Sequence, residues 1–335
     1  MFAVADLNRD RAKAVATEQG VMELPVADLL AHPIIDAVLN LTIPGAHLEV
    51  DVAALKAGKH VYAEKPLALD PLRAARMLKL AERLGLQVGS APDTMLGTGI
   101  QTAREILDSD RIGSAVAASA FWASPGHELW HPAPQFYYQP GGGPLFDKGP
   151  YYLSTLVTLL GPVVRVSGAT SRSSRRREVA TGPNAGLPVD VAVDTNVSAL
   201  LEHLSGVTST ITVRFDVWAS RHPRIEVYGT SGTVAVPDPN RFSDPVQVWT
   251  VDAPEWGEVP ATAGYVDAAR GFGLAEMARA IATNHPHRAS GQLAFHVLDI
   301  MDAIARSGHG HKVLNVTSTV GRPAPVPVGA RPDSW

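Results

Sequence analysis

Cysteine is missing from all 335 residues of this sequence. The chain therefore has no disulfide, no thiolate metal site and no thiol nucleophile. No stretch approaches the roughly 18 uncharged apolar residues that a membrane-spanning helix needs. A net charge of −4 gives no cationic footprint for nucleic acid or an anionic membrane. The first residues, MFAVADLNRD, lack the apolar core of a signal peptide, so we expect a cytoplasmic protein without nucleic-acid or membrane partners.

Apolar residues, by contrast, are abundant enough for a large core. They make up 45% of the chain against 19% charged residues, a balance typical of globular proteins. At roughly 100–200 residues per domain, the length predicts about two domains.

The first ninety residues alternate short apolar runs with amphipathic stretches. This rhythm predicts a doubly wound parallel α/β sheet. The expected strands cover 2–5, 36–43, 60–64 and 86–91, and the expected helices cover 9–20, 26–32, 47–58 and 71–85.

From about residue 115 the pattern changes to long segments with a period of two. Such alternation predicts a large, mainly antiparallel sheet with one open or partner-covered face. Its strands are expected at 114–124, 195–204, 206–218 and 223–230, and its helices at about 150–160, 266–283 and 290–306. The chain should therefore divide into a Rossmann-like domain, 1–95, and an α+β domain, 96–335, for substrate binding and for oligomerisation as a homodimer or homotetramer.

A glycine-rich phosphate loop is also absent. In a dinucleotide-binding fold, G-x-G-x-x-G follows the first strand, and an acid follows about 20 residues later at the end of the second strand. Asp6 stands where that acid belongs. We therefore expect that roughly 30 residues, the first βα unit with its loop, are missing. Alternatively, Asp6 is only a turn residue.

Two motifs give the sequence a family resemblance. The first lies in DAVLNLTIPGAHLEVDVAALKAGKHVYAEKPLALD (36–70), with Thr42-Ile43-Pro44, His47 and Glu64-Lys65-Pro66. The second is GGGPLFDKGPYYLSTLVTLLG (141–161). Together they resemble the glucose–fructose oxidoreductase/inositol dehydrogenase (Gfo/Idh/MocA) family. Two departures from the family pattern occur: Tyr151 stands at the position of a histidine, and Ser154 at that of an aspartate.

The resemblance implies an NAD(P)-dependent oxidoreductase acting on the CH–OH group of a sugar, an inositol or a related polyol. It implies a cis bond before Pro66 that aims Lys65 across the cleft. In this interpretation Tyr151 exchanges a proton with the substrate, Lys65 stabilises its oxygen, and Asp147 positions the substrate or the lysine. A nearby ammonium should lower the pKa of Tyr151.

The same resemblance implies the residues that contact the cofactor. An acid without a neighbouring cation repels a 2′-phosphate, so Asp6, followed by Leu7 and Asn8, predicts NAD and makes NADP less favourable. The residues expected to contact the cofactor are Asp6, Thr42, Pro44, His47, Glu64, Lys65 and Pro66.

Each motif also has a purely structural interpretation. Asp147 could cap a helix over 148–160, and Tyr151 could be a core aromatic. The stretch 127–143 is rich in aromatic residues. Its rings could stack on a sugar or could only hold the loop in place by packing; the residues are Trp130, His131, Tyr137 and Tyr138.

Two further stretches are weaker signals. The basic run SRSSRRRE (171–178) predicts a solvated strand end rather than a phosphate site. HGHK (309–312) holds too few ligands for a metal site.

Two other functions stay open. One is an NAD-dependent glycosidase of the same fold, which returns the hydride and breaks a glycosidic bond. The other is a non-catalytic regulator that senses a sugar or a dinucleotide. Lys65 together with Tyr151 argues against the regulator, because a sensor needs no proton relay.

Overall fold

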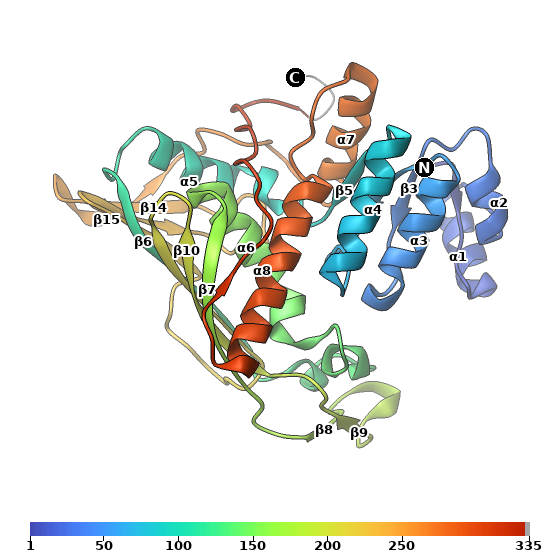
Figure 1. The fold of residues 1–335 in the computed structure, drawn as a ribbon, viewed down its shortest axis with the longest axis horizontal. Helices are drawn as coiled ribbons and strands as arrows, with labels where there is room; N and C mark the ends of the chain where they lie inside the picture. Colours follow the sequence, from blue (N-terminus) through green and yellow to red (C-terminus); the bar gives the residue numbers. More distant parts are fainter. Residues whose placement is uncertain (332–335) are drawn as a thin grey trace.

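The computed structural model describes residues 1–331. It contains two sheet systems joined by long helices (Figure 1). Short parallel strands with helices α1–α4 form one side, and a large mixed sheet forms the other. This arrangement confirms the predicted combination of a Rossmann-type region and an α+β region.

The parallel strands belong to two small sheets. β1 pairs with β2, and β3, β4 and β5 pair in that order, all in parallel. The strands are β1 (Ala3–Val4), β2 (Met22–Glu23), β3 (Ala37–Asn40), β4 (His60–Ala63) and β5 (Val88–Ser90). The helices are α1 (Arg9–Gln19), α2 (Val26–Ala31), α3 (Pro44–Lys56) and α4 (Pro71–Leu84).

The ends of these helices follow the sequence signals closely. The side chain of Asp70 accepts hydrogen bonds from the first turn of α4, and Pro71 follows as the first helical residue. Gly20 and Gly85 close α1 and α4 in the left-handed conformation that glycine favours. Among the strands and helices of this parallel region, only β2, two residues long, was not predicted.

The large sheet has nine strands in the order β15-β14-β13-β12-β6-β11-β10-β7-β16. All neighbours are antiparallel except β6 and β11, so the prediction of a mainly antiparallel sheet is confirmed. The strands are β6 (Ala115–Ala123), β7 (Val163–Ser171), β10 (Asn196–His203), β11 (Thr208–Arg214), β12 (Ile225–Gly229), β13 (Gly232–Val236), β14 (Val246–Thr250), β15 (Ala253–Val259) and β16 (Leu314–Asn315). A separate hairpin pairs β8 (Arg176–Glu178) with β9 (Pro188–Asp190).

Helices cover one face of this sheet. They are α5 (Thr98–Asp108), α6 (Gly143–Leu160) and α8 (Gly291–Gly310), whereas α7 (Phe272–Thr283) packs on β5 of the parallel region. Short 3-10 turns are η1 (Thr94–Leu96), η2 (His127–Leu129), η3 (Gln135–Tyr138) and η4 (Gly182–Asn184). The sequence analysis did not predict α5. Valine, leucine and isoleucine side chains on alternate positions of β10 to β13 are buried against the helices. Across residues 1–331, no helix combines the length and hydropathy needed to cross a membrane.

α8 connects the two sheet systems. It contacts β7 of the large sheet, and it also contacts β5 and α4 of the parallel region. In Figure 1 it runs between the large sheet and α4. Because α6 also packs on α8, the start of α6 lies beside the carboxyl ends of β4 and β5. In open α/β sheets, ligands bind outside the carboxyl ends of the strands.

Candidate active site

Lys65 stands directly after β4, in the turn Glu64-Lys65-Pro66. The Lys65–Pro66 peptide bond is cis, as the family resemblance implied. A side-chain oxygen of Glu64 accepts the Lys65 backbone N–H at 3.0 Å. The lysine reaches α6, where its Nζ donates to the backbone oxygen of Asp147 at 2.8 Å and to Asp147 Oδ1 at 2.9 Å. A side chain from the parallel region is therefore bonded to a helix of the large-sheet region.

The side chain of His47 holds this turn through its two ring nitrogens. Its Nδ1 lies 2.8 Å from the Pro66 carbonyl oxygen, and its Nε2 lies 2.8 Å from the Thr42 carbonyl oxygen. The ring is 1% exposed, and both of its nitrogens face backbone oxygens. His47 therefore ties the loop after β3 to the turn after β4, with Pro66 buried beside it, and its contact with a cofactor stays a prediction.

Three consecutive glycines allow α6 to begin where it does. Gly141 and Gly143 have φ values of 91° and 79°, a conformation that side chains disfavour. A Cβ atom on Gly142 would lie 2.5 Å from the carbonyl oxygen of Tyr137. Because Gly142 is the residue that precedes the helix, Asp147 lies inside α6, and its interpretation as a helix cap is wrong.

Asp147 is the electrostatic centre of the site. Oδ1 bonds to Lys65, and Oδ2 lies 2.8 Å from His127 Nε2 and 3.4 Å from Lys148 Nζ. Burial alone would raise the pKa of Asp147, but the hydrogen bond with His127 and the charges of Lys65 and Lys148 outweigh it and hold that pKa well below its usual range. Burial likewise works to lower the pKa of Lys65, yet the charges around it, Asp147 first, raise it.

Tyr151 lies one helical turn after Asp147 and is 7% exposed. The centre of its ring is 5.4 Å from Lys65 Nζ, 5.4 Å from Arg270 Cζ and 6.0 Å from Lys148 Nζ. Its hydroxyl makes no hydrogen bond with any residue in 1–331. Burial raises the pKa of Tyr151 and outweighs the opposing charges of Lys65 and Arg270. The expectation of a lowered pKa was therefore wrong, because the sequence did not show how deeply the ring is buried.

The aromatic loop approaches the same carboxylate. His127, in η2, is 3% exposed and packs between the rings of Trp122, Trp130, Tyr137 and Phe215. Trp130 is 57% exposed, and His131 is half-buried beside it.

Tyr138 differs from these neighbours because it is completely buried. Its hydroxyl donates to Glu128 and accepts the His127 backbone N–H. These contacts give Tyr138 a role in holding the loop, and its contact with substrate stays a prediction.

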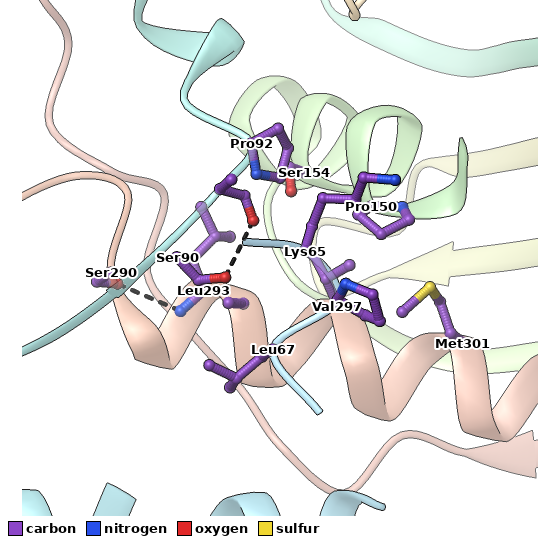
Figure 2. Close-up of a pocket in the computed structure, with 13 residues that line it drawn as sticks. Lys65, Leu67, Ser90, Pro92, Pro150, Ser154, Ser290, Leu293, Val297 and Met301 are labelled. Atoms are coloured by element: carbon purple, nitrogen blue, oxygen red, sulfur yellow. Dashed lines mark hydrogen bonds between the residues drawn. The ribbon is translucent and has the colours of Figure 1, made fainter. Parts of the chain in front are cut away.

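A small pocket surrounds the stem of Lys65. Figure 2 shows Lys65 beside Pro150 and Ser154 of α6, with α8 forming the opposite wall. Ser154, which stands at the family's aspartate position, thus faces the lysine stem. The other lining residues are Pro66, Leu67, Ser90, Ala91, Pro92, Ser290, Leu293, Ala294, Val297 and Met301.

Several features fit a bound dinucleotide. Thr42 and Pro44 follow β3, Glu64 and Lys65 follow β4, and Asp6 follows β1, all at carboxyl ends of parallel strands. The Asp6 carboxylate accepts the backbone N–H of Asn8, and its other oxygen lies 3.5 Å from Arg11. No glycine-rich strand–helix turn occurs within residues 1–331. The same residues contain no group of three or more His, Asp or Glu side chains arranged to hold a metal ion.

Sequence reasoning missed His127, Lys148 and Arg270. Lys148 follows Asp147 directly, so its position was visible, but its packing over the Trp122 ring was not. His127 lies in the aromatic-rich stretch 127–143 but was not singled out there, and Arg270 reaches the site from a distant loop. Most of the basic run is exposed, in keeping with a solvated strand end. Arg177 is the exception, because its side chain is 10% exposed and ion-paired with Glu128 and Asp216.

Comparisons with known proteins agree with this architecture. Residues 1–91 match the profile described as "Oxidoreductase family, NAD-binding Rossmann fold", and residues 100–235 match that of the GFO/IDH/MocA C-terminal domain. A dTDP-3,4-didehydro-2,6-dideoxy-alpha-D-glucose 3-reductase of Streptomyces violaceoruber is 34% identical over 55% of this chain and 53% of that protein. Inositol 2-dehydrogenase 3 of Saccharopolyspora erythraea is 29% identical over 73% and 68%.

The aligned part therefore spans about half the length of the first of these relatives. Among solved structures, apo levoglucosan dehydrogenase superposes with a TM-score of 0.81 at 20% identity, over 95% of this chain and 90% of that one. An NAD-binding oxidoreductase from Klebsiella pneumoniae superposes with a TM-score of 0.80 at 23% identity, with the same coverage. At these identities the structures show a shared fold.

With both family profiles in chain order and both sequence motifs at the site, this chain belongs to the Gfo/Idh/MocA oxidoreductase family.

Proposed function

We propose that this protein is an NAD-dependent oxidoreductase that transfers a hydride between nicotinamide and a secondary alcohol or ketone of a sugar, an inositol or a related polyol. One observation carries the proposal: Lys65 is bonded to Asp147, one turn before Tyr151, and its ammonium lies 5.4 Å from the Tyr151 ring. The names of the relatives, a sugar reductase and an inositol dehydrogenase, support this substrate class.

Tyr151 supplies the proton. Its raised pKa keeps the phenol protonated at neutral pH, and its hydroxyl is not engaged by any described residue. It can therefore donate a proton to a substrate carbonyl oxygen in the direction of reduction. Lys65 faces the same region as a cation and stabilises the negative charge that develops on that oxygen. The nicotinamide, when bound, supplies or accepts the hydride.

Asp6, Thr42, Pro44 and Glu64 would hold the dinucleotide at the strand ends. Asp6 would accept hydrogen bonds from the ribose hydroxyls and favour NAD over NADP. Arg11, 3.5 Å from Asp6, is a nearby cation that the sequence analysis did not consider. It is 68% exposed and forms a weak pair, so we retain the preference for NAD.

The substrate would lie against the aromatic loop. Trp130 offers an exposed ring for stacking on a sugar, and His131 lies beside it with a polar edge. The Trp130 ring also contacts the His127 ring, and the His131 ring contacts the Tyr137 ring. We propose Trp130 and His131 as substrate contacts.

The open face of the large sheet is proposed as a homodimer or homotetramer interface. Ser198 and Thr212 face outward from β10 and β11 and hydrogen-bond to each other at 3.0 Å, with Leu200 42% exposed beside them. A flat face of small polar and apolar side chains suits packing on a copy of itself. We also propose a domain division at 95/96, supported by the η1 turn there. A cytoplasmic location stays a prediction.

A spectrophotometric screen tests the activity. The protein is mixed with NAD or NADP and a panel containing myo-inositol, levoglucosan and common hexoses, and nicotinamide absorbance is followed. We expect net formation of reduced NAD with at least one substrate, and its loss in Lys65→Met. Cleavage of a glycoside without net NADH would favour the glycosidase alternative. Sugar binding with no turnover of any kind would favour the regulator.

A further inference from the structure

Among residues 1–331, His127 is the residue of the aromatic loop whose side chain hydrogen-bonds to Asp147. Its Nε2 lies 2.8 Å from Asp147 Oδ2, on the carboxylate oxygen that Lys65 does not use. A carboxylate accepts only, so the hydrogen of this bond belongs to Nε2. The carboxylate is thereby held at both oxygens, by Lys65 at one end and by His127 at the other. This arrangement fixes its plane, and with it the direction of the bond to Lys65.

The imidazole ring is closely packed among aromatic side chains. Four aromatic rings surround it, with Tyr137 and Phe215 nearest at 4.3 and 4.5 Å between centroids. Its backbone N–H donates to the Tyr138 hydroxyl at 3.0 Å. Tyr138 in turn bonds to Glu128, which is paired with Arg177. His127 is therefore held by the loop, independently of Asp147.

The Nδ1 atom of His127 is buried and makes no hydrogen bond with any described residue. A histidine kept only for packing would be replaceable by an apolar ring, which has no such unsatisfied atom. An unpaired buried nitrogen costs stability, so the bond from Nε2 to Asp147 is the contact that accounts for an imidazole here.

We propose that His127 is a positioning residue that holds Asp147 so that the Lys65 ammonium stays beside Tyr151. This inference rests on the proposed function, because it concerns a residue that supports the same active site. His127 acts through Asp147 and has no contact with the reacting atoms. The other charged or titratable groups around Asp147 are Lys65, Lys148, Tyr137 and Tyr151.

Two matched substitutions test the proposal. His127→Phe keeps an aromatic ring within the cage but removes the donor to Asp147. His127→Gln keeps an N–H donor at about the position of Nε2. Since a hydrogen bond to a charged group is worth about 10-fold to 100-fold in an equilibrium or a rate, we expect kcat to fall by that factor in His127→Phe, with little change in KM. His127→Gln should recover most of the loss.

The pH profile separates positioning from a general structural defect. Without His127, the pKa of Asp147 should rise, because that hydrogen bond helps to lower it. The acid limb of kcat should then move to higher pH in His127→Phe and return toward the wild-type position in His127→Gln. A merely structural role would reduce kcat equally at every pH and would not be rescued by glutamine.

A second readout needs no substrate. Carbon-13 NMR of the aspartate carboxyl groups, assigned with Asp147→Asn, should show Asp147 titrating at higher pH in His127→Phe than in the wild type. An unchanged titration in both variants would overturn the proposal, even if no substrate had been found. Normal turnover in Lys65→Met would instead refute the proposed function, whereas loss in Lys65→Met with full activity in His127→Phe would refute only the positioning role.

Discussion

Replacing Tyr151 with phenylalanine is the sharpest test of the proposed proton transfer. The change removes one oxygen atom and keeps the ring that packs near Lys65, Lys148 and Arg270. Because the lost hydroxyl bonds to no residue in 1–331, the folded state loses no internal hydrogen bond. We therefore expect the free energy of unfolding to change by less than about 1 kcal/mol.

The effect on turnover should be much larger. General acid–base assistance contributes about 10²–10⁴ in rate, which corresponds to about 3–5 kcal/mol of transition-state stabilisation at 1.36 kcal/mol per tenfold. Tyr151→Phe should lower kcat by that factor. The double variant with Lys65→Met should be little worse than the poorer single variant, because residues that act as a unit are not additive.

The assay is steady-state reduction of a carbonyl substrate with NADH, paired with chemical denaturation of each variant. Tyr152→Phe is the matched control: it removes the same atom one residue along α6, from a ring that is 1% exposed. It should leave kcat unchanged. If Tyr151→Phe keeps near-normal turnover, Tyr151 is a core aromatic, the proton travels by another group, and His131 is the first to test.

Four other predictions follow from separate contacts. Arg177→Met should lower the free energy of unfolding by about 3–5 kcal/mol, measured by denaturation, because it leaves the buried Glu128 carboxylate uncompensated. Burial raises the pKa of Asp51 to about 7, whereas in the unfolded chain the pKa of an aspartate is near 4. The Asp51 carboxyl therefore lowers the free energy of unfolding as the pH rises above about 4. Asp51→Asn should raise the free energy of unfolding by up to about 4 kcal/mol at pH 8 and by little at pH 4. Titration calorimetry should show NAD binding more tightly than NADP, and Asp6→Ser should narrow that difference; tighter NADP binding by the wild type would contradict the role of Asp6. Light scattering should show a dimer or tetramer at micromolar concentration, and Thr212→Arg, a charge on the open sheet face, should shift it toward monomer.

The sequence predicted those parts of the molecule whose signals are local. Alternation of short apolar runs with amphipathic stretches depends on neighbouring residues, and it indicated β1 and β3 to β5 with their helices. The cis turn at Pro66 and the pairing of Lys65 with α6 followed from two family motifs. Asp147 and Tyr151 are four residues apart in one helix, so their shared face follows from helical geometry.

The remaining features depend on contacts between distant segments. The pKa of Tyr151 is governed by burial, which a sequence does not display, and the prediction accordingly had the wrong sign. Arg177 lies in a run of charges that resembles a solvated strand, and only the fold brings Glu128 and Asp216 to it. His47 matched a family motif, but the two carbonyl oxygens that engage its ring come from two separate loops.

The charges at the site require both sheet systems. An isolated ammonium buried as deeply as Lys65 would tend to lose its proton. Asp147 prevents this, yet its single negative charge is shared between Lys65 and Lys148. Together with Arg270, these groups leave the surroundings of the Tyr151 ring rich in positive charge, which favours negative charge developing on a substrate oxygen.

That environment is assembled from segments far apart in the chain. Lys65 comes from the turn after β4, Asp147 and Tyr151 come from α6, and α8 packs against α6, α4 and β5. A change that loosened α8 would therefore separate Lys65 from Asp147 without altering either residue. The lysine would then lose the carboxylate that keeps it charged, and Tyr151 would lose the neighbouring cation that stabilises the oxyanion. Docking of the two regions is thus a condition for the chemistry as well as for stability.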